Sequence, residues 1–197
     1  MDKHWSVGIL LFDEVEVLDF AGPFEVFSIT TMPNKTKPFS VHTVSQYGSM
    51  IKARNGLAVQ PSCSFETAPT FDILIIPGGY GAEEIEINNE VVIQWIKEMR
   101  GKVGIIASVC TGAFLLAQAG ILDGKRATTH WMDIDRLENE FPNVKVERNC
   151  KFVDEGATIT AGGISAGINM SLYIIKRLLS EEIMKSTAKR MEYDILF

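Results

Sequence analysis

Short apolar runs alternate with longer stretches of helical periodicity along most of this chain. Three of the runs, residues 6–12, 71–76 and 103–107, are almost continuously apolar. Such runs are typical of strands that lie inside a parallel sheet, because helices cover both of its faces. Residues 39–45 instead alternate between apolar and polar side chains, which indicates a half-buried strand.

Apolar residues at helical spacing predict helices between these strands. Pro23 fits best in the first turn of a helix, where its missing N–H is not needed, so we expect residues 18–22 to form the loop that leads into that helix. Further helices are expected over 88–99, from Gly112 onward, and over 132–141, 167–179 and 181–193.

Two regions of short strands are also predicted. Asn55-Gly56 is a strong hairpin signal within residues 50–60. Residues 144–147, 150–153 and 157–161 are expected to form a short β-meander. Together, the elements predict one domain over residues 1–197, with an α/β fold. The predicted fold class is a flavodoxin-like three-layer α/β/α sandwich with a mostly parallel central sheet.

The amino-acid composition limits the cellular compartments and the binding partners that we expect for this chain. The 197 residues carry a net charge of −6 without a dense basic run, which argues against nucleic acid or an anionic membrane as the main partner. No apolar stretch approaches the ~20 residues of a membrane span, and residues 1–5 lead into a strand without the layout of a signal peptide. Three cysteines cannot all pair, and their spacing fits no zinc motif. We therefore expect a cytoplasmic protein with neither a metal nor an organic cofactor.

Cys110 stands where the strand 103–107 gives way to the helix that starts near Gly112. A residue on such a nucleophile elbow has a strained backbone, and its side chain points out over the end of the sheet. The first free N–H groups of the helix would stabilise a thiolate there. The alternative is a small buried apolar side chain that happens to be cysteine. The strand, turn, glycine and helix together favour the reactive thiol.

Three other features also follow strands and can meet Cys110 at the carboxyl edge of the sheet, where ligands bind in such folds. They are Asp19, Gly78-Gly79 and His130. Asp19 is a candidate acid, although an aspartate in this position more often caps a helix or forms a turn. The two glycines expose backbone N–H groups that can hold an oxyanion, or they simply form a flexible turn.

Four stretches of the chain resemble the ThiJ/PfpI superfamily, which has a class I glutamine amidotransferase-like fold. They are LDFAGPFEVF (18–27), IIPGG (75–79), SVCTGAFLLAQAGILDGKRATTHW (108–131) and TAGGISAGINM (160–170). Within the superfamily the chain is similar to isonitrile hydratases and to the amidase-like N-terminal domains of AraC-type regulators. In isonitrile hydratases a threonine follows the nucleophilic cysteine, and an aspartate comes from the first βα loop. Cys110, Thr111 and Asp19 match that pattern.

Departures from the superfamily pattern narrow the activity that the resemblance implies. Residues 162–170 hold neither the His nor the Glu of an amidotransferase triad, and Thr111 stands where PfpI-type proteases carry His. The resemblance therefore implies hydration of a small electrophile, foremost an isonitrile to its N-formamide. A redox or metabolite sensor, a holding chaperone and a protein that removes glyoxal adducts are the alternatives. Because the regulators carry a DNA-binding domain after this fold and the chain stops at Phe197, direct transcriptional regulation is not expected.

Several finer expectations follow for the site and the assembly. The proton is expected to remain on Asp19 while the pKa of Cys110 is lowered. The N–H groups of Gly79 and Thr111 are candidates to hold negative charge, and the Thr111 hydroxyl to orient water. His130 aligns with a superfamily histidine that follows a Thr-Thr pair, and we expect a supporting role for it. The superfamily usually forms homodimers, and the apolar side chains of the first helix favour the same here, because one inward face cannot absorb them all. These side chains are Phe20, Phe24, Val26 and Phe27.

Overall fold

A seven-stranded sheet forms the centre of the computed structural model, which describes residues 3–195. Neighbouring strands are parallel throughout the sheet, except that the edge strand β10 runs antiparallel to β11. From one edge to the other, the order is β10 (Phe152–Asp154), β11 (Thr158–Ala161), β7 (Ile105–Val109), β6 (Ile73–Ile76), β1 (Trp5–Leu10), β2 (Phe39–Ser45) and β5 (Cys63–Ser64).

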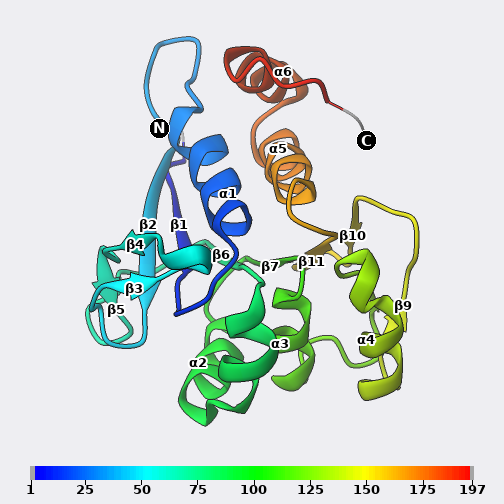
Figure 1. Ribbon diagram of the computed structural model, residues 1–197. Helices are drawn as coiled ribbons and strands as arrows, with labels where there is room; N and C mark the ends of the chain where they lie inside the picture. Colours follow the sequence, from blue (N-terminus) through cyan, green and yellow to red (C-terminus); the bar gives the residue numbers. More distant parts are fainter. Residues whose placement is uncertain (1–2, 196–197) are drawn as a thin grey trace.

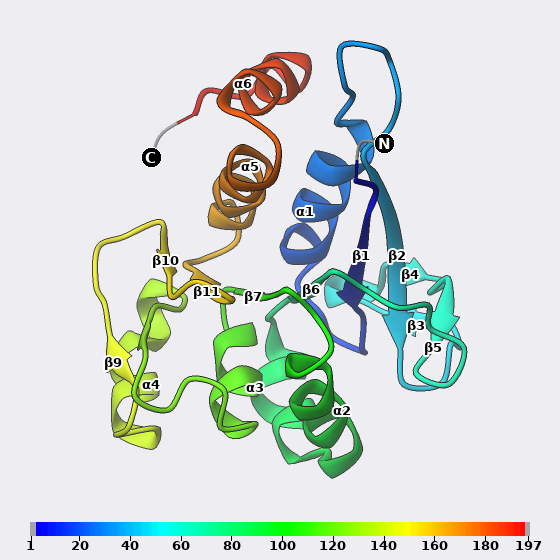
Figure 2. The same cartoon turned by 180° about the vertical axis from the view of Figure 1, so that it is seen from behind.

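Helices cover both faces of this sheet (Figures 1 and 2). One layer holds α1 (Val17–Ile29), α5 (Ala166–Leu178) and α6 (Glu181–Arg190), and the other holds α2 (Glu90–Arg100), α3 (Gly112–Gln118) and α4 (Ile134–Glu140). The predicted three-layer sandwich with a mostly parallel sheet is thereby confirmed. Within residues 3–195, no helix has the length and apolar character needed to cross a membrane.

The first helix begins earlier than predicted. α1 starts at Val17, so Pro23 lies inside it and Asp19 is in its first turn. Pro23 has no N–H to donate to the carbonyl of Asp19, a defect that costs roughly 3 kcal/mol in an isolated helix. Packing against α5 compensates for it here: the Pro23 ring lies 3.5 Å from where a Cβ on Gly167 would be. The local rule for proline is thus overridden by a contact with a distant part of the chain.

The short strands outside the central sheet agree with the prediction only in part. The hairpin is present, since β3 (Ile51–Lys52) pairs antiparallel with β4 (Ala58–Val59), and Asn55 has a φ of 57° in the turn. The β-meander is wrong at its first strand. β9 (Lys145–Val146) pairs in parallel with β8 (Arg126–Ala127) instead of joining β10. The turn at Gly124, whose N–H donates to the carbonyl of Asn143 at 2.8 Å, brings these two segments together.

More of the apolar side chains of α1 are buried within the chain than the sequence predicted. Phe20, Val26 and Phe27 are buried in the core. Phe24 and Leu18 remain exposed, at 38% and 39% of their full surface. The apolar surface that α1 leaves available to a partner is therefore smaller than the sequence suggested.

Candidate active site

Cys110 occupies the strained turn that the sequence predicts between β7 and α3. Its φ is 55°, a left-handed value that few residues other than glycine adopt. Its N–H donates to the carbonyls of Ala161, at 3.1 Å, and Gly162, at 3.0 Å. The Thr129 hydroxyl donates to the carbonyl of Cys110 at 2.8 Å. Such strain persists only where surrounding contacts hold it, and here β11 and the segment after β8 do so.

Asp19 is completely buried beside this turn. Its Oδ2 accepts a hydrogen bond from the N–H of Gly78 at 3.0 Å, so its side chain does not serve as a helix cap. Its Oδ1 is buried without a well-aligned hydrogen-bond partner in residues 3–195. Burial, and to a smaller extent the charge of Glu16, raises the pKa of Asp19 to about 7, while the Gly78 N–H and the Cys110 thiol oppose the shift. The raised pKa expected for this carboxyl is therefore present.

The Cys110 thiol differs from expectation in the direction of its pKa. The side chain is only 7% exposed. Burial, followed by the negative charge of Asp19, raises the pKa of Cys110, against the opposing effect of the N–H groups of Thr111 and Ile164. The helix N-terminus was expected to lower it, but loss of water around the sulfur outweighs a few N–H groups. The pair formed by Cys110 and Asp19 thus retains at least one proton near neutral pH.

The backbone N–H groups of Gly78 and Gly79 link the Asp19 side of the site to Thr111. The Gly78 N–H is engaged by Asp19, and the Gly79 N–H donates to Thr111 Oγ1 at 2.9 Å. Side chains cannot be accommodated at either position, because a Cβ on Gly78 would lie 2.5 Å from the Thr111 nitrogen and one on Gly79 would lie 2.5 Å from the Glu16 nitrogen. The proposed oxyanion role of Gly79 is therefore not supported by the resting geometry, since its N–H is already used.

Thr111 is 1% exposed and lies in the middle of this junction. Its hydroxyl accepts the Gly79 N–H at 2.9 Å and donates to the Gly79 carbonyl at 3.5 Å. The expected role of this hydroxyl in orienting water stays a prediction. Its backbone N–H acts on the sulfur of Cys110, as expected.

Two participants were missed in the sequence. The N–H of Ile164 acts on the Cys110 sulfur, and Ile164 has a φ of 42°, which is unusual for a β-branched residue. The glycines at 162 and 163 are a signal of an irregular turn, but nothing in the sequence shows where its N–H groups point. The second is Glu83, whose charge raises the pKa of Cys110 less than burial and Asp19 do. It lies in an acidic stretch, 83–86, that resembles an ordinary solvated surface.

His130 lies against the segment that carries Ile164. A Cβ on Gly163 would come within 2.2 Å of the His130 ring, so the two are in close contact. His130 Nδ1 accepts from the Met132 N–H at 3.4 Å and lies 3.4 Å from Asp133 Oδ2. This placement is compatible with the supporting role that we expect for His130.

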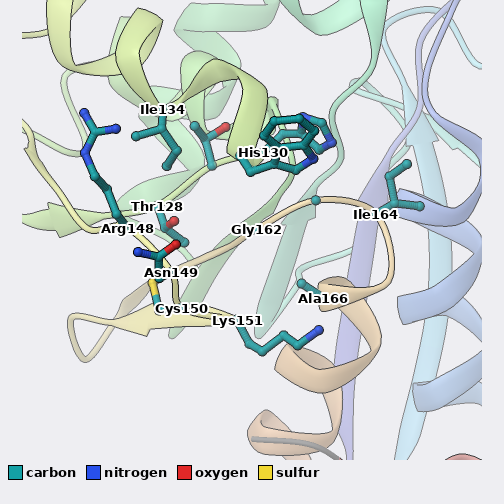
Figure 3. Close-up of a pocket in the computed structure, with 13 residues that line it drawn as sticks. Thr128, His130, Ile134, Arg148, Asn149, Cys150, Lys151, Gly162, Ile164 and Ala166 are labelled. Atoms are coloured by element: carbon teal, nitrogen blue, oxygen red, sulfur yellow. The ribbon is translucent and has the colours of Figure 1, made fainter.

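A cavity of about 680 Å³ lies beside the same segment (Figure 3). It shares Thr129, Gly162 and Ile164 with the shell that holds Cys110, but the sulfur itself does not line it. In the part of the chain that the structure describes, no three His, Cys, Asp or Glu side chains are grouped so as to hold a metal ion. The remaining lining residues are Thr128, His130, Trp131, Ile134, Arg148, Asn149, Cys150, Lys151, Gly163 and Ala166.

Comparison with known proteins identifies the family of this fold and site. The profile of the DJ-1/PfpI family matches residues 5–177. The chain belongs to the DJ-1/PfpI family. The resemblance seen in the sequence is thereby confirmed, and the match includes Asp19, Cys110 and Ile164.

Relatives within the DJ-1/PfpI family have different functions. Isonitrile hydratase from Pseudomonas putida is 32% identical over 189 residues, which cover 95% of this chain and 78% of that protein. The HTH-type transcriptional regulator GbdR of Pseudomonas aeruginosa is 26% identical over 96% of this chain and 51% of the regulator, so the chain spans about half of that relative.

Solved structures of family members share the fold. Drosophila melanogaster DJ-1beta has a TM-score of 0.84 at 22% identity, with 98% of this chain and 100% of that chain covered. A ThiJ/PfpI family protein from Pseudomonas syringae has a TM-score of 0.82 at 24% identity, with 98% and 77% covered. At these identities the likeness concerns the arrangement of the chain alone.

Proposed function

We propose that this protein is a cysteine-dependent hydratase that converts an isonitrile, R–N≡C, into the N-formamide. The observation that carries the proposal is the pairing of Cys110, on its strained turn, with the fully buried Asp19 carboxyl. The 32% identity to an isonitrile hydratase over 95% of this chain supports it. The reaction requires a soft nucleophile, a proton and water, so protein side chains are sufficient for it.

The first step uses the one proton that the pair shares. As the Cys110 sulfur bonds to the terminal carbon of the isonitrile, its proton passes to Asp19 and from there to the same carbon. The product is a thioimidate, Cys–S–CH=N–R, and both side chains then lack the proton that has been transferred. The Cys110–Asp19 pair has the same net charge whether this proton starts on the sulfur or on the carboxyl group.

The second step adds water to the thioimidate carbon. The nitrogen gains one proton of the water, the carbon–sulfur bond breaks, and the formamide R–NH–CHO leaves. The other proton returns to the Cys110–Asp19 pair, so the site is restored. The N–H groups of Thr111 and Ile164 face the sulfur and stabilise the negative charge that develops on it as it leaves.

Purified protein incubated with cyclohexyl isonitrile tests this function, with N-cyclohexylformamide followed by NMR. We expect turnover by the wild type and none by Cys110→Ala, because the nucleophile is lost. Cys63→Ala removes a free thiol on the edge strand β5, outside the candidate site, and should leave the rate within twofold. Absence of product with the wild type at micromolar enzyme would reject the proposal.

A second candidate is a redox or metabolite sensor that uses Cys110, and the kinship to a transcriptional regulator favours it. Removal of glyoxal adducts or a chaperone role would use the same thiol. Mild peroxide followed by peptide mass spectrometry separates sensing from catalysis. If exposed Cys150 is oxidised while buried Cys110 remains a thiol, sensing through Cys110 is rejected.

A further inference from the structure

The cavity of about 680 Å³ beside the candidate site has no role in the proposed hydration, because the Cys110 sulfur does not line it. It is enclosed by the segment after β8, by the residues that precede β10 and by the start of α5 (Figure 3). Its volume is in the range of pockets that hold small organic ligands. The chemistry of its wall therefore bears on which ligand it can take.

The formally charged side chains that line this cavity are both cationic, although the whole chain has a net charge of −6. They are Arg148 and Lys151, and no described Asp or Glu is among the lining residues. Arg148 is already paired with Asp135, at 2.7 Å, and with Glu138, at 2.6 Å. Lys151 has no ion-pair partner within residues 3–195, so its charge is free to bind an anion.

A buried hydroxyl group without a partner also faces this cavity. Thr128 is only 2% exposed and is part of the cavity wall. Its N–H donates to Thr160 Oγ1 at 2.9 Å, but its own hydroxyl makes no hydrogen bond to the described part of the chain. A buried hydroxyl is unfavourable when it stays unpaired. Since the protein supplies no partner, the cavity is the side from which a ligand can bind it.

The N-terminus of α5 is a second feature suited to negative charge. This helix has 13 residues, and Ser165 at its N-cap makes no side-chain cap bond. The N–H of Gly163, which lines the cavity, has no hydrogen-bond partner among residues 3–195. Free N–H groups and the helix dipole together favour an anion at such a place. Figure 3 shows the Lys151 side chain extending toward Ala166, the first residue of α5.

Apolar side chains complete the wall of the cavity. Trp131 is 77% exposed there, and Ile134 and Ala166 are buried beside it. A bare inorganic anion would leave this apolar surface in contact with water, whereas an organic acid would cover it. The wall thus combines a cationic end, a free hydroxyl and an apolar surface.

We propose that this cavity is a binding site for a small organic acid. The carboxylate of the acid pairs with Lys151 and accepts the N–H of Gly163, a second polar atom bonds to the Thr128 hydroxyl, and the apolar body packs on Trp131. The site is separate from the Cys110–Asp19 pair. The inference goes beyond the proposed function and does not depend on it, because binding is measured without turnover.

Isothermal titration calorimetry of the full chain with 4-hydroxybenzoate at pH 7.5 and low salt tests the proposal. This probe carries a carboxylate, an aromatic ring and a hydroxyl group. We expect a Kd below about 1 mM, and a Kd at least tenfold higher for the neutral 4-hydroxybenzamide. Equal affinity for acid and amide, no binding at about 5 mM acid, or tighter binding of inorganic phosphate than of the acid would overturn the proposal.

Variants of the lining residues test where the acid binds. Lys151→Met keeps the apolar stem without the charge and should weaken binding at least tenfold, and Thr128→Val, which keeps the shape, should weaken it three- to tenfold. Lys145→Met is the matched control, because Lys145 is exposed on β9 and does not line the cavity. Its affinity should stay within twofold of the wild type. Equal weakening in the two lysine variants would show a long-range effect of charge alone and reject the site.

Tryptophan fluorescence locates the bound acid independently. We expect 4-hydroxybenzoate to quench part of the emission of the wild type and little of that of Trp131→Phe, which keeps an aromatic side chain. Cys110→Ala should bind the acid within twofold of the wild type, and loss of binding in that variant would place the acid at the thiol and overturn the inference. If the wild type does not turn over the isonitrile, the proposed function fails, while the binding results still decide this site.

Discussion

The two oxygen atoms of the Asp19 carboxyl group have different surroundings. Oδ2 is satisfied by the Gly78 N–H, whereas Oδ1 is buried without a well-aligned partner among residues 3–195. An unsatisfied, fully buried carboxylate oxygen is costly, but a protonated one can donate to a neighbouring sulfur. This asymmetry is a physical reason for a proton to reside between Asp19 and Cys110, and it has consequences for both stability and rate.

Stability should depend on pH through Asp19. The pKa of this carboxyl is raised from 3.8 to about 7 on folding, so its contribution to stability is complete below pH 3.8 and is lost as the pH rises through 7. The loss amounts to roughly 4 kcal/mol at most, from 1.36 kcal/mol per pKa unit. Asp19→Asn cannot ionise, and its free energy of unfolding, measured with urea, should gain on the wild type between pH 4 and pH 8. A constant difference would contradict this, and exposed Asp123→Asn should show one.

The rate of isonitrile hydration should also depend on the protonation of the Cys110–Asp19 pair. The proposed chemistry requires one proton on the Cys110–Asp19 pair, and a second proton is bound below the pKa of Asp19, about 7. For cyclohexyl isonitrile, kcat/KM should therefore fall tenfold per pH unit below about 7 and level off above it. Asp19→Asn should lose turnover at every pH. Near wild-type rates in that variant would show that Asp19 does not handle the proton.

Individual residues differed in how far the sequence could identify them. The local pattern of strand, turn and helix indicated Cys110, whereas Asp19 was favoured as the acid only through the resemblance to isonitrile hydratases. The Ile164 N–H and the Glu83 carboxylate could not be found from the sequence, because their effect on the sulfur depends on backbone direction and on distance across the fold. The direction of the Cys110 pKa was wrong for the same reason: burial is a property of the whole surroundings, whereas the helix N-terminus is visible locally.

At the level of elements, the site depends on how closely α3 approaches the end of β6. A Cβ on Gly112 would lie 2.2 Å from the carbonyl oxygen of Ile76, and backbone cannot move away as a flexible side chain could. The glycine therefore sets the distance between the helix and the strand, and with it the position of the turn that holds Cys110.

Gly112→Ala should lower stability by about 3 kcal/mol, the upper end of the usual cost of overpacking, because the atoms it would meet are rigid backbone. Thermal unfolding measures the effect. Gly101→Ala is the control, because its Cβ would make an ordinary contact at 3.6 Å and its φ of −80° suits alanine. A change in Tm of similar size for both variants would argue against the close approach at Gly112.

Boundaries of elements were predictable where local signals act alone. Asn89 caps α2 by accepting from the N–H groups of Val91 and Val92, close to the predicted start of that helix. The start of α1 was not predictable, because the contact between Pro23 and Gly167 joins residues far apart in the sequence. The pairing of β9 with β8 was not predictable for the same reason, because it depends on where a turn places two short segments.

For the whole molecule, the order of layers followed from the alternation of strands and helices, and the comparisons confirm the family. Assembly remains a proposal: we propose a homodimer in which α1 contributes its exposed Leu18 and Phe24. Both side chains are half-exposed apolar groups on the helix that carries Asp19, so an interface there would adjoin the candidate site.

Light scattering at micromolar concentration should give the mass of a dimer. Phe24→Glu places a charge in the proposed interface and should shift the protein toward the monomer. Val91→Glu is the control, because Val91 is exposed on α2 in the opposite helix layer, and it should not alter the mass. A monomeric wild type would reject the dimer.

The junction at Gly78-Gly79 also bears on how the protein is made. Its two N–H groups bind Asp19 on α1 and Thr111 at the N-cap of α3, and the Ile164 N–H lowers the pKa of the Cys110 thiol. A ribosome releases these pieces from the N-terminus onward, so Asp19 emerges long before Ile164 exists. Until the later elements cover it, the Asp19 carboxyl lacks the burial that raises its pKa in the folded chain. The shared proton therefore arises only when synthesis of the domain is nearly complete, and a growing chain does not carry the charge state of the finished site.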